Sequence, residues 1–132
     1  MKLLISTLAA LTLLSASALA ADPVAGEKVF AKCKVCHAIG EEAKNKVGPQ
    51  LNGIEGRKMA SIADFKGYAA DLKKMGEDGG MWTAANLAVY LKDPKAFNPG
   101  TKMAFAGIKD EGELADVVAY LLQFGPTGAK KQ

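Results

Sequence analysis

Two cysteines and one histidine, Cys33, Cys36 and His37, lie within five consecutive residues and carry the clearest chemistry of the chain. Their spacing, C-x-x-C-H, is typical of a covalent haem attachment site. Thiols three positions apart share one side of a helical turn, so both can form thioether bonds to the vinyl groups of one haem. His37 then lies under the ring, where its imidazole can bind the iron. The chain has no other cysteine or histidine.

Other interpretations of this motif are less well supported. A zinc site as a rule takes four ligands, and a second Cys or His pair is missing. A thioredoxin-like dithiol would need a βαβ pattern, and no strand pattern is visible. A disulfide between Cys33 and Cys36 would close a very small loop, stabilise little and leave His37 without a role. We therefore predict covalent haem, with a redox-active dithiol protein as the main alternative, and a visible spectrum distinguishes the two.

Residues 1–20 have the features of an export signal. Lys2 precedes an almost wholly apolar run, Leu3 to Leu14, and Ala18-Leu19-Ala20 matches a small-residue cleavage site. A retained membrane anchor is the alternative, because the apolar run is only slightly short for a span. We expect cleavage after Ala20, a single mature domain over residues 21–132, and a periplasmic location in which haem is attached after export.

The length and net charge of the chain narrow the classes of function that remain possible. The chain has 132 residues and a net charge of +3, with no basic run interleaved with aromatic residues. This mild balance argues against nucleic-acid binding, and we expect a monomer. A domain of this size has a modest core, and a buried haem would supply much of the missing apolar surface.

Helical periodicity predicts an all-α domain with long loops. The expected helices are at about 22–33, 69–75, 83–91 and 111–124. The last is the clearest, because apolar residues recur at helical spacing before Gly125-Pro126. Asp22 and Thr83 are expected N-caps, and Gly76 is expected to end the second helix. The loops 40–56 and 97–107 are unusually long, which favours a cofactor for them to pack against.

Beyond the haem motif, residues 22–124 resemble the class I cytochromes c, which include mitochondrial cytochrome c and the soluble cytochromes c2 of purple bacteria. The motifs that carry the resemblance are CKVCH at 33–37, GPQLNGIEGRK at 48–58, Trp82, LAVYLKDPKAF at 87–97, PGTKMAF at 99–105 and DVVAYL at 116–121. The resemblance implies a fold in which crossed N- and C-terminal helices, shorter helices and long loops surround one covalent haem c. Two departures are a stretch 57–82 that is longer than in the mitochondrial protein, and residues 125–132, which extend past the last helix and are expected to be disordered.

On the histidine side of the haem, the resemblance implies that Cys33 and Cys36 attach the ring and that His37 binds the iron. The Pro49 carbonyl would accept the second ring N–H of His37. Around the inner propionates the resemblance implies three further residues, Arg57, Tyr68 and Trp82.

On the opposite side, a methionine sulfur is expected to bind the iron. On composition alone Met59, Met75, Met81 or Met103 could do so. Met103 is favoured because it follows a Pro-Gly turn in a loop without helical periodicity, and the resemblance implies the same residue, with the hydroxyl of Tyr90 near its sulfur. The resemblance also implies that Gly26 and Phe30 pack against Val117 and Tyr120.

The sequence predicts a soluble one-electron carrier rather than an enzyme, because protein ligands at both axial sites leave no place for a substrate. The alternative is a haem sensor or enzyme with an open or labile sixth site, which carbon monoxide binding would reveal. Expected partners are larger redox proteins: a cytochrome bc complex, an oxidase, a peroxidase or a photosynthetic reaction centre. They would dock at lysines near the haem edge, namely Lys32, Lys34, Lys95, Lys102 and Lys109, although any single lysine is more often only a solubilising charge.

Overall fold

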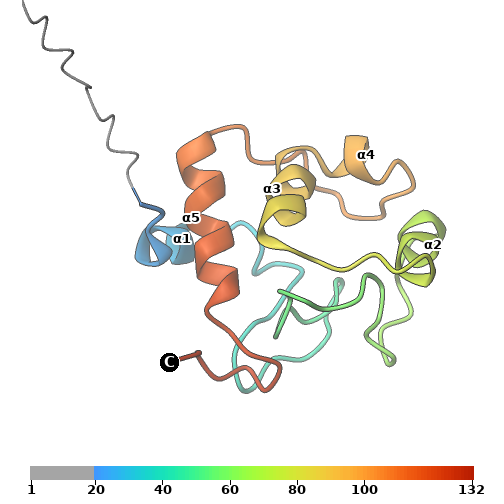
Figure 1. Cartoon of the computed structure of the whole chain (residues 1–132), viewed down its shortest axis with the longest axis horizontal. Helices are drawn as coiled ribbons and strands as arrows, with labels where there is room; N and C mark the ends of the chain where they lie inside the picture. Colours follow the sequence, from blue (N-terminus) through green and yellow to red (C-terminus); the bar gives the residue numbers. More distant parts are fainter. Residues whose placement is uncertain (1–19) are drawn as a thin grey trace, which may run out of the picture.

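The computed structural model describes residues 20–132, which form five helices and their connecting loops (Figure 1). The helices are α1 Pro23–Phe30, α2 Ala70–Glu77, α3 Ala84–Lys92, α4 Pro94–Phe97 and α5 Glu111–Leu122. Within the described residues the only β pairing is two isolated bridges, Lys58 with Met81 and Phe124 with Lys130. None of the helices described is long and apolar enough to cross a membrane. The predicted export signal lies, except for Ala20, outside the described residues.

The first and last helices cross at a close contact, which confirms the expected pairing of the two ends of the domain (Figure 1). A Cβ atom on Gly26 would lie 1.9 Å from the Asp116 carbonyl oxygen, so only glycine allows α1 to approach α5 this closely. The rings of Phe30 and Tyr120 lie 5.2 Å apart. Val117 is fully buried.

Side-chain caps begin most of the helices. The Asp22 carboxylate accepts from Val24 N at 2.8 Å, and Pro23 follows at the first helical position. Thr83 and Asn86 form a reciprocal capping box at the start of α3. Both N-caps were predicted from the sequence.

Two helix ends differ from the prediction. The helix α1 ends at Phe30 rather than near Cys33, because the next amides bond to carbonyls three residues back and the chain tightens into turns. In α2, Gly76 lies inside the helix and does not end it. A Cβ on Gly76 would lie 2.1 Å from the Met59 carbonyl oxygen, so this glycine allows close packing, and the chain turns at Gly79, where φ is +93°.

The short helix α4 was not predicted. Its four residues are too few to show a periodic pattern, and they begin with Pro94 after an Asp93 N-cap that accepts from Ala96 N at 3.0 Å.

The C-terminal residues 125–132 form a turn instead of the expected disordered tail. Lys131 N donates to Gln123 O at 2.7 Å, and Gly125 N donates to Ala129 O at 2.9 Å. Gly128 has a φ of +84° and packs where a Cβ would lie 2.2 Å from the Gly40 carbonyl oxygen. The family resemblance ends before this segment, so no sequence pattern indicated the turn.

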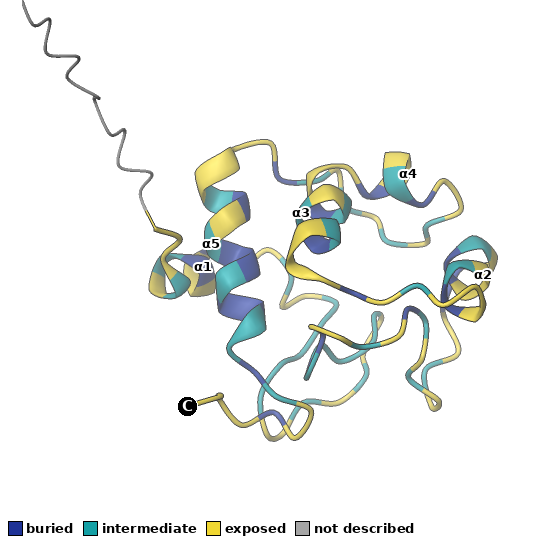
Figure 2. Cartoon of the chain, viewed as in Figure 1, coloured by how far each residue is buried: buried dark blue, intermediate teal, exposed yellow. Residues whose placement is uncertain are grey.

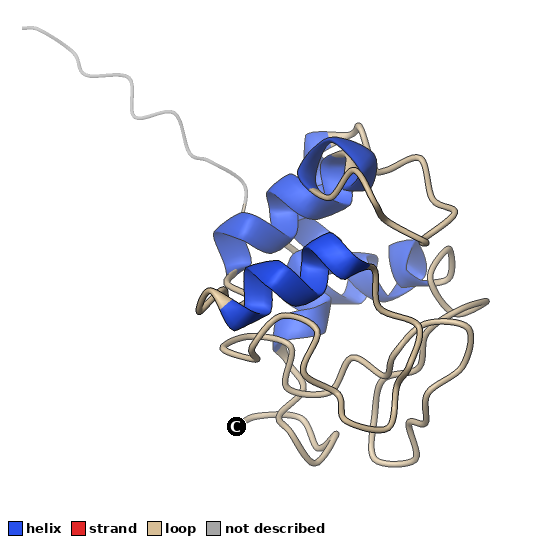
Figure 3. Cartoon of the chain, turned by 90° about the vertical axis from the view of Figure 1, so that its right-hand side faces the viewer, coloured by secondary structure: helices blue, strands red, loops and turns tan. Residues whose placement is uncertain are grey.

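The buried residues line the inner sides of α3 and α5 and continue into the loops (Figure 2). Most of the helices gather in one half of the molecule and the long loops in the other (Figure 3). The sequence motifs whose residues could carry chemistry lie mainly in the loop half or where it joins the helices.

Candidate haem site

The Cys-x-x-Cys-His segment forms tight turns directly after α1. Cys36 N and His37 N both donate to Cys33 O, at 3.0 and 2.8 Å, which gathers the three side chains around one turn. Both thiols are free and partly buried. Burial raises the pKa of the Cys33 thiol above its ordinary value. A redox-active dithiol works through a thiolate with a lowered pKa, and the burial of Cys33 does not favour that form.

The ring of His37 is fixed in one orientation by the loop that follows. Its Nδ1 lies 2.7 Å from the Pro49 carbonyl oxygen, so Nδ1–H donates there and the Nε2 lone pair is left available for a metal. Burial lowers the pKa of His37, which favours the neutral, metal-binding form. A Cβ on Gly48 would lie only 2.3 Å from the ring atom Cε1, so the loop can approach the imidazole this closely only with glycine at that position.

A second potential ligand, Met103, lies in the loop after α4. Tyr90 Oη lies 3.8 Å from Met103 Sδ, within hydrogen-bond range for sulfur. Burial raises the pKa of Tyr90, so the hydroxyl keeps its proton and can donate. The Tyr90 ring packs against Trp82 at 5.1 Å and Phe97 at 5.4 Å between centroids. These aromatic contacts hold the hydroxyl beside the sulfur.

The other three methionines of the described region lie in different surroundings. Met59 is buried in the core, Met75 packs against the core from α2, and Met81 is 44% exposed. None of them takes part in a side-chain hydrogen bond of the described residues like that between Met103 and Tyr90.

Arg57 is a half-buried cation held by backbone carbonyls. Its Nη1 donates to Gln50 O at 2.9 Å and to Asn52 O at 3.2 Å, and burial lowers its pKa. Among residues 20–132 no carboxylate forms an ion pair with it. A buried cation is normally paired, so this arrangement indicates a place for an anionic group.

Tyr68 and Trp82 lie close to Arg57. Trp82 N donates to Arg57 O at 2.9 Å, which joins the two segments. Tyr68 Oη accepts from Ile62 N at 3.2 Å. Burial raises the pKa of Tyr68, and the nearby Arg57 charge partly counters the shift. The structure therefore brings Arg57, Tyr68 and Trp82 together. It also brings the Cys-His turn against Pro49, and Tyr90 against Met103.

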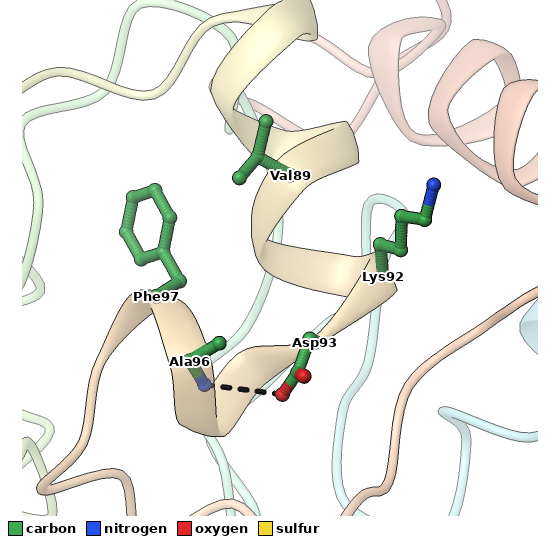
Figure 4. A pocket seen from close by; sticks show the side chains of 5 residues that line it. All are labelled: Val89, Lys92, Asp93, Ala96 and Phe97. Carbon is green, nitrogen blue, oxygen red and sulfur yellow. Dashed lines mark hydrogen bonds between the residues drawn. The ribbon is translucent and has the colours of Figure 1, made fainter.

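A surface hollow of about 290 Å³ lies elsewhere, at the corner between α3 and α4 (Figure 4). Its lining is Val89, Lys92, Asp93, Ala96 and Phe97. Of these, Phe97 alone touches the aromatic group around Tyr90, and none of the candidate ligands reaches the hollow. The hollow is thus separate from the candidate site.

Comparison with known proteins places this arrangement in a family. The family described as Cytochrome c matches residues 23–125. The chain is 52% identical over 112 residues to cytochrome c-554 of Methylosinus trichosporium, covering 85% of this chain and 82% of that protein. It is 49% identical over 116 residues to cytochrome c2 of Blastochloris viridis, covering 88% of each. The solved cytochrome c2 of Rhodospirillum centenum superposes with a TM-score of 0.74 at 43% identity, over 80% of this chain and 99% of that one.

The chain belongs to the cytochrome c family. Its cofactor is therefore haem c, and its general function is electron transfer. The predicted class I cytochrome c fold is also confirmed. The residues of this cytochrome c fit the group, because two free thiols, an available imidazole nitrogen, a thioether and an unpaired cation occur in the described structure.

Two residues of the site were not singled out from the sequence. Asn52 is buried and bonds reciprocally with Gly40, through Oδ1 to N and through Nδ2 to O, each at 2.8 Å, while its carbonyl accepts from Arg57. Its place inside the GPQLNGIEGRK motif was the available clue. Asp71 contacts the loop that carries Met103 and lies in the stretch 57–82 that is longer than in the mitochondrial protein.

Proposed function

We propose that this cytochrome c is a periplasmic one-electron carrier, not an enzyme, with His37 and Met103 as the two axial ligands. When bound, the haem supplies a one-electron couple at its iron. The observation that carries the proposal is the contact between Tyr90 Oη and Met103 Sδ, since it orients a soft potential ligand in a loop without helical structure. Both ligands come from the protein, which leaves no position for a substrate at the metal.

Each residue of the proposed site holds or orients a group. Pro49 and Gly48 fix the His37 ring, and Tyr90 orients the Met103 sulfur. Cys33 and Cys36 attach the haem covalently. We assign Arg57, Tyr68 and Trp82 to the inner propionates, because an unpaired half-buried guanidinium beside a tyrosine hydroxyl is suited to carboxylates. A methionine ligand favours the reduced iron and raises the reduction potential.

We assign docking of larger redox proteins to the lysines near the haem edge. Lys34, Lys95 and Lys102 are exposed, and none of them belongs to an ion pair of the described region. Lys32 instead pairs with Glu113 at 2.8 Å, and Lys109 Nζ donates to Lys92 O at 2.6 Å. The first three lysines therefore contribute most to steering an acidic partner, such as a cytochrome bc complex, an oxidase, a peroxidase or a reaction centre.

Visible spectroscopy with a redox titration tests the proposal. A purified exported protein should show a covalent haem spectrum and a single reversible one-electron transition. The reduced protein should not bind carbon monoxide at neutral pH, because Met103 fills the sixth site. Rapid carbon monoxide binding would instead favour the sensor or enzyme alternative, and absence of haem would favour the dithiol.

A further inference from the structure

The loop that carries Met103 is tied to the rest of the domain at few points. In the described structure, hydrogen bonds join residues 99–107 to other helices at two places, Tyr90 of α3 and Asp71 of α2, and Thr101 is bonded to Asn98 at the end of α4. One is the contact of Met103 with Tyr90 at the sulfur itself. The other is from Gly100 N to Asp71 Oδ2, at 2.7 Å across 29 residues of sequence. Figure 1 shows α2, which carries Asp71, beside the loop that leaves α4.

Three features converge on the Asp71 carboxylate. Besides the Gly100 amide, the side chain of Asn98 faces it, and the amide orientation that satisfies both groups directs the Asn98 nitrogen to the two carboxylate oxygens. Asn98 is only 1% exposed, so this polar side chain is desolvated and depends on that partner. A Cβ on Gly100 would lie 2.7 Å from Asp71 Oδ1, so glycine allows the turn to reach the carboxylate.

The same turn leads directly to the proposed ligand. Thr101 N donates to Asn98 O at 2.9 Å, and the Thr101 hydroxyl accepts from Met103 N at 3.1 Å. A continuous set of hydrogen bonds therefore runs from Asp71 through the Asn98 turn to the backbone of Met103. Moving the turn away from α2 would move the residue that follows it.

We propose that Asp71 is a positioning residue for Met103, holding the Asn98–Gly100 turn so that the methionine sulfur stays at the iron. The inference rests on the proposed role of Met103 as a ligand. It gives α2 a role: the helix lies in the stretch that is longer than in mitochondrial cytochrome c, and it supplies an acceptor for the ligand loop. Without this acceptor the loop opens more often, and an external ligand competes better for the sixth site.

Imidazole titration of the oxidised holoprotein tests the proposal, because imidazole binds the iron only when Met103 has left it. Asp71→Ala should tighten the apparent imidazole affinity about tenfold, the loss expected from removing a charge-assisted hydrogen bond. Asp71→Asn can still accept from Gly100 N and pair with a reoriented Asn98 amide, so its affinity should stay within about threefold of the parent protein. Asp78→Ala is the matched control, because it also removes a carboxylate next to α2. The Asp78 carboxylate pairs with the exposed Lys74 and not with the Met103 loop.

An Asp71→Ala variant that binds imidazole no better than Asp78→Ala would overturn the proposal. An Asp71→Asn variant that binds imidazole as tightly as Asp71→Ala would also overturn it, because the charge of the carboxylate rather than its hydrogen bonds would then hold the loop. Hydrogen exchange of the Gly100 amide separates this inference from the proposed function: Asp71→Ala should speed that exchange whether or not Met103 binds iron. Faster exchange without tighter imidazole binding would mean that the contact exists but does not hold the ligand.

Discussion

Two halves of this cytochrome c are stabilised in different ways. The helical half, defined as α1, α3 and α5, is held by buried apolar side chains, with Val117 fully buried and Phe30 1% exposed. The loop half, residues 33–69 and 98–109, also buries apolar side chains such as Ile54 and Ile108, but it depends in addition on separate polar contacts such as His37 to Pro49 and Gly100 to Asp71. Packing of this kind is collective, whereas each polar contact of a loop acts on one side chain. The comparison indicates that the scaffold provides stability and the loops provide the ligands.

The largest effect should follow from preventing haem attachment. In Cys33→Ala with Cys36→Ala the loop half loses the group it surrounds, and the crossed helices alone bury too little to offset the entropy of ordering the chain. Circular dichroism and urea titration should show a largely unfolded protein. A cooperatively folded, haem-free double variant would show that the two halves do not depend on the haem as we describe.

The next largest effect should come from the helix crossing. Gly26→Ala places a methyl group 1.9 Å from the Asp116 carbonyl oxygen, and overpacking of this kind lowers the free energy of unfolding by about 1–3 kcal/mol or more. The midpoint potential should hardly change, because the ligands lie in the loops. Gly112→Ala in the first turn of α5 is the control: its Cβ would lie 3.2 Å from a single side-chain atom, the Asp110 Oδ1 that caps the helix, so any loss of stability should be much smaller than at Gly26. Equal losses in the two variants would contradict the close-contact account.

A change in the loop half, at Arg57, should alter the midpoint potential as well as the free energy of unfolding. Arg57→Leu leaves the Gln50 and Asn52 carbonyls without their donor, for a loss of about 1–2 kcal/mol in unfolding free energy. It should also lower the midpoint potential, because removing a positive charge near the iron favours the oxidised form. Arg57→Lys keeps the charge and should keep most of the potential while losing stability. An unchanged potential in Arg57→Leu would place the guanidinium away from the haem.

The smallest effect should come from the C-terminal turn. Lys131 and Glu55 form an exposed ion pair at 3.5 Å, and such pairs contribute at most about 1 kcal/mol. Lys131→Ala should therefore lie within error of the parent protein in thermal unfolding, whereas deletion of residues 126–132 should lower the unfolding temperature measurably. Gly128 packs on Gly40, and Pro126 packs so closely on Gly53 that a Cβ there would lie 2.8 Å away. Deletion without effect would mean that these contacts do not support the loop.

The same division explains what the sequence could predict. Helix α5 and the N-caps Asp22 and Thr83 follow local rules of periodicity and capping, so they were predicted closely. The Cys-x-x-Cys-His turn was also evident, because its chemistry depends on spacing alone. These features require no knowledge of which distant segments meet.

Features that depend on distant contacts were not predictable from the sequence alone. Gly76 has the sequence context of a helix end, yet its role is set by the Met59 backbone 17 residues earlier in the printed sequence. The role of Asp71 depends on Gly100, and the turn at 125–132 depends on Gly40. Local patterns do not reveal such pairings, because the residue type at a loop position depends on the distant segment that it contacts and not on a periodic repeat.

The far-red sulfur-to-iron band of the oxidised protein tests the central claim most directly. We expect Met103→Ala to abolish this band and to lower the midpoint potential, because the soft ligand is lost. Met59→Leu, Met75→Leu and Met81→Leu keep similar packing volumes and should each retain the band. Survival of the band in Met103→Ala, with its loss in one of the other three variants, would contradict the account, since the sixth ligand would then lie outside the Met103 loop.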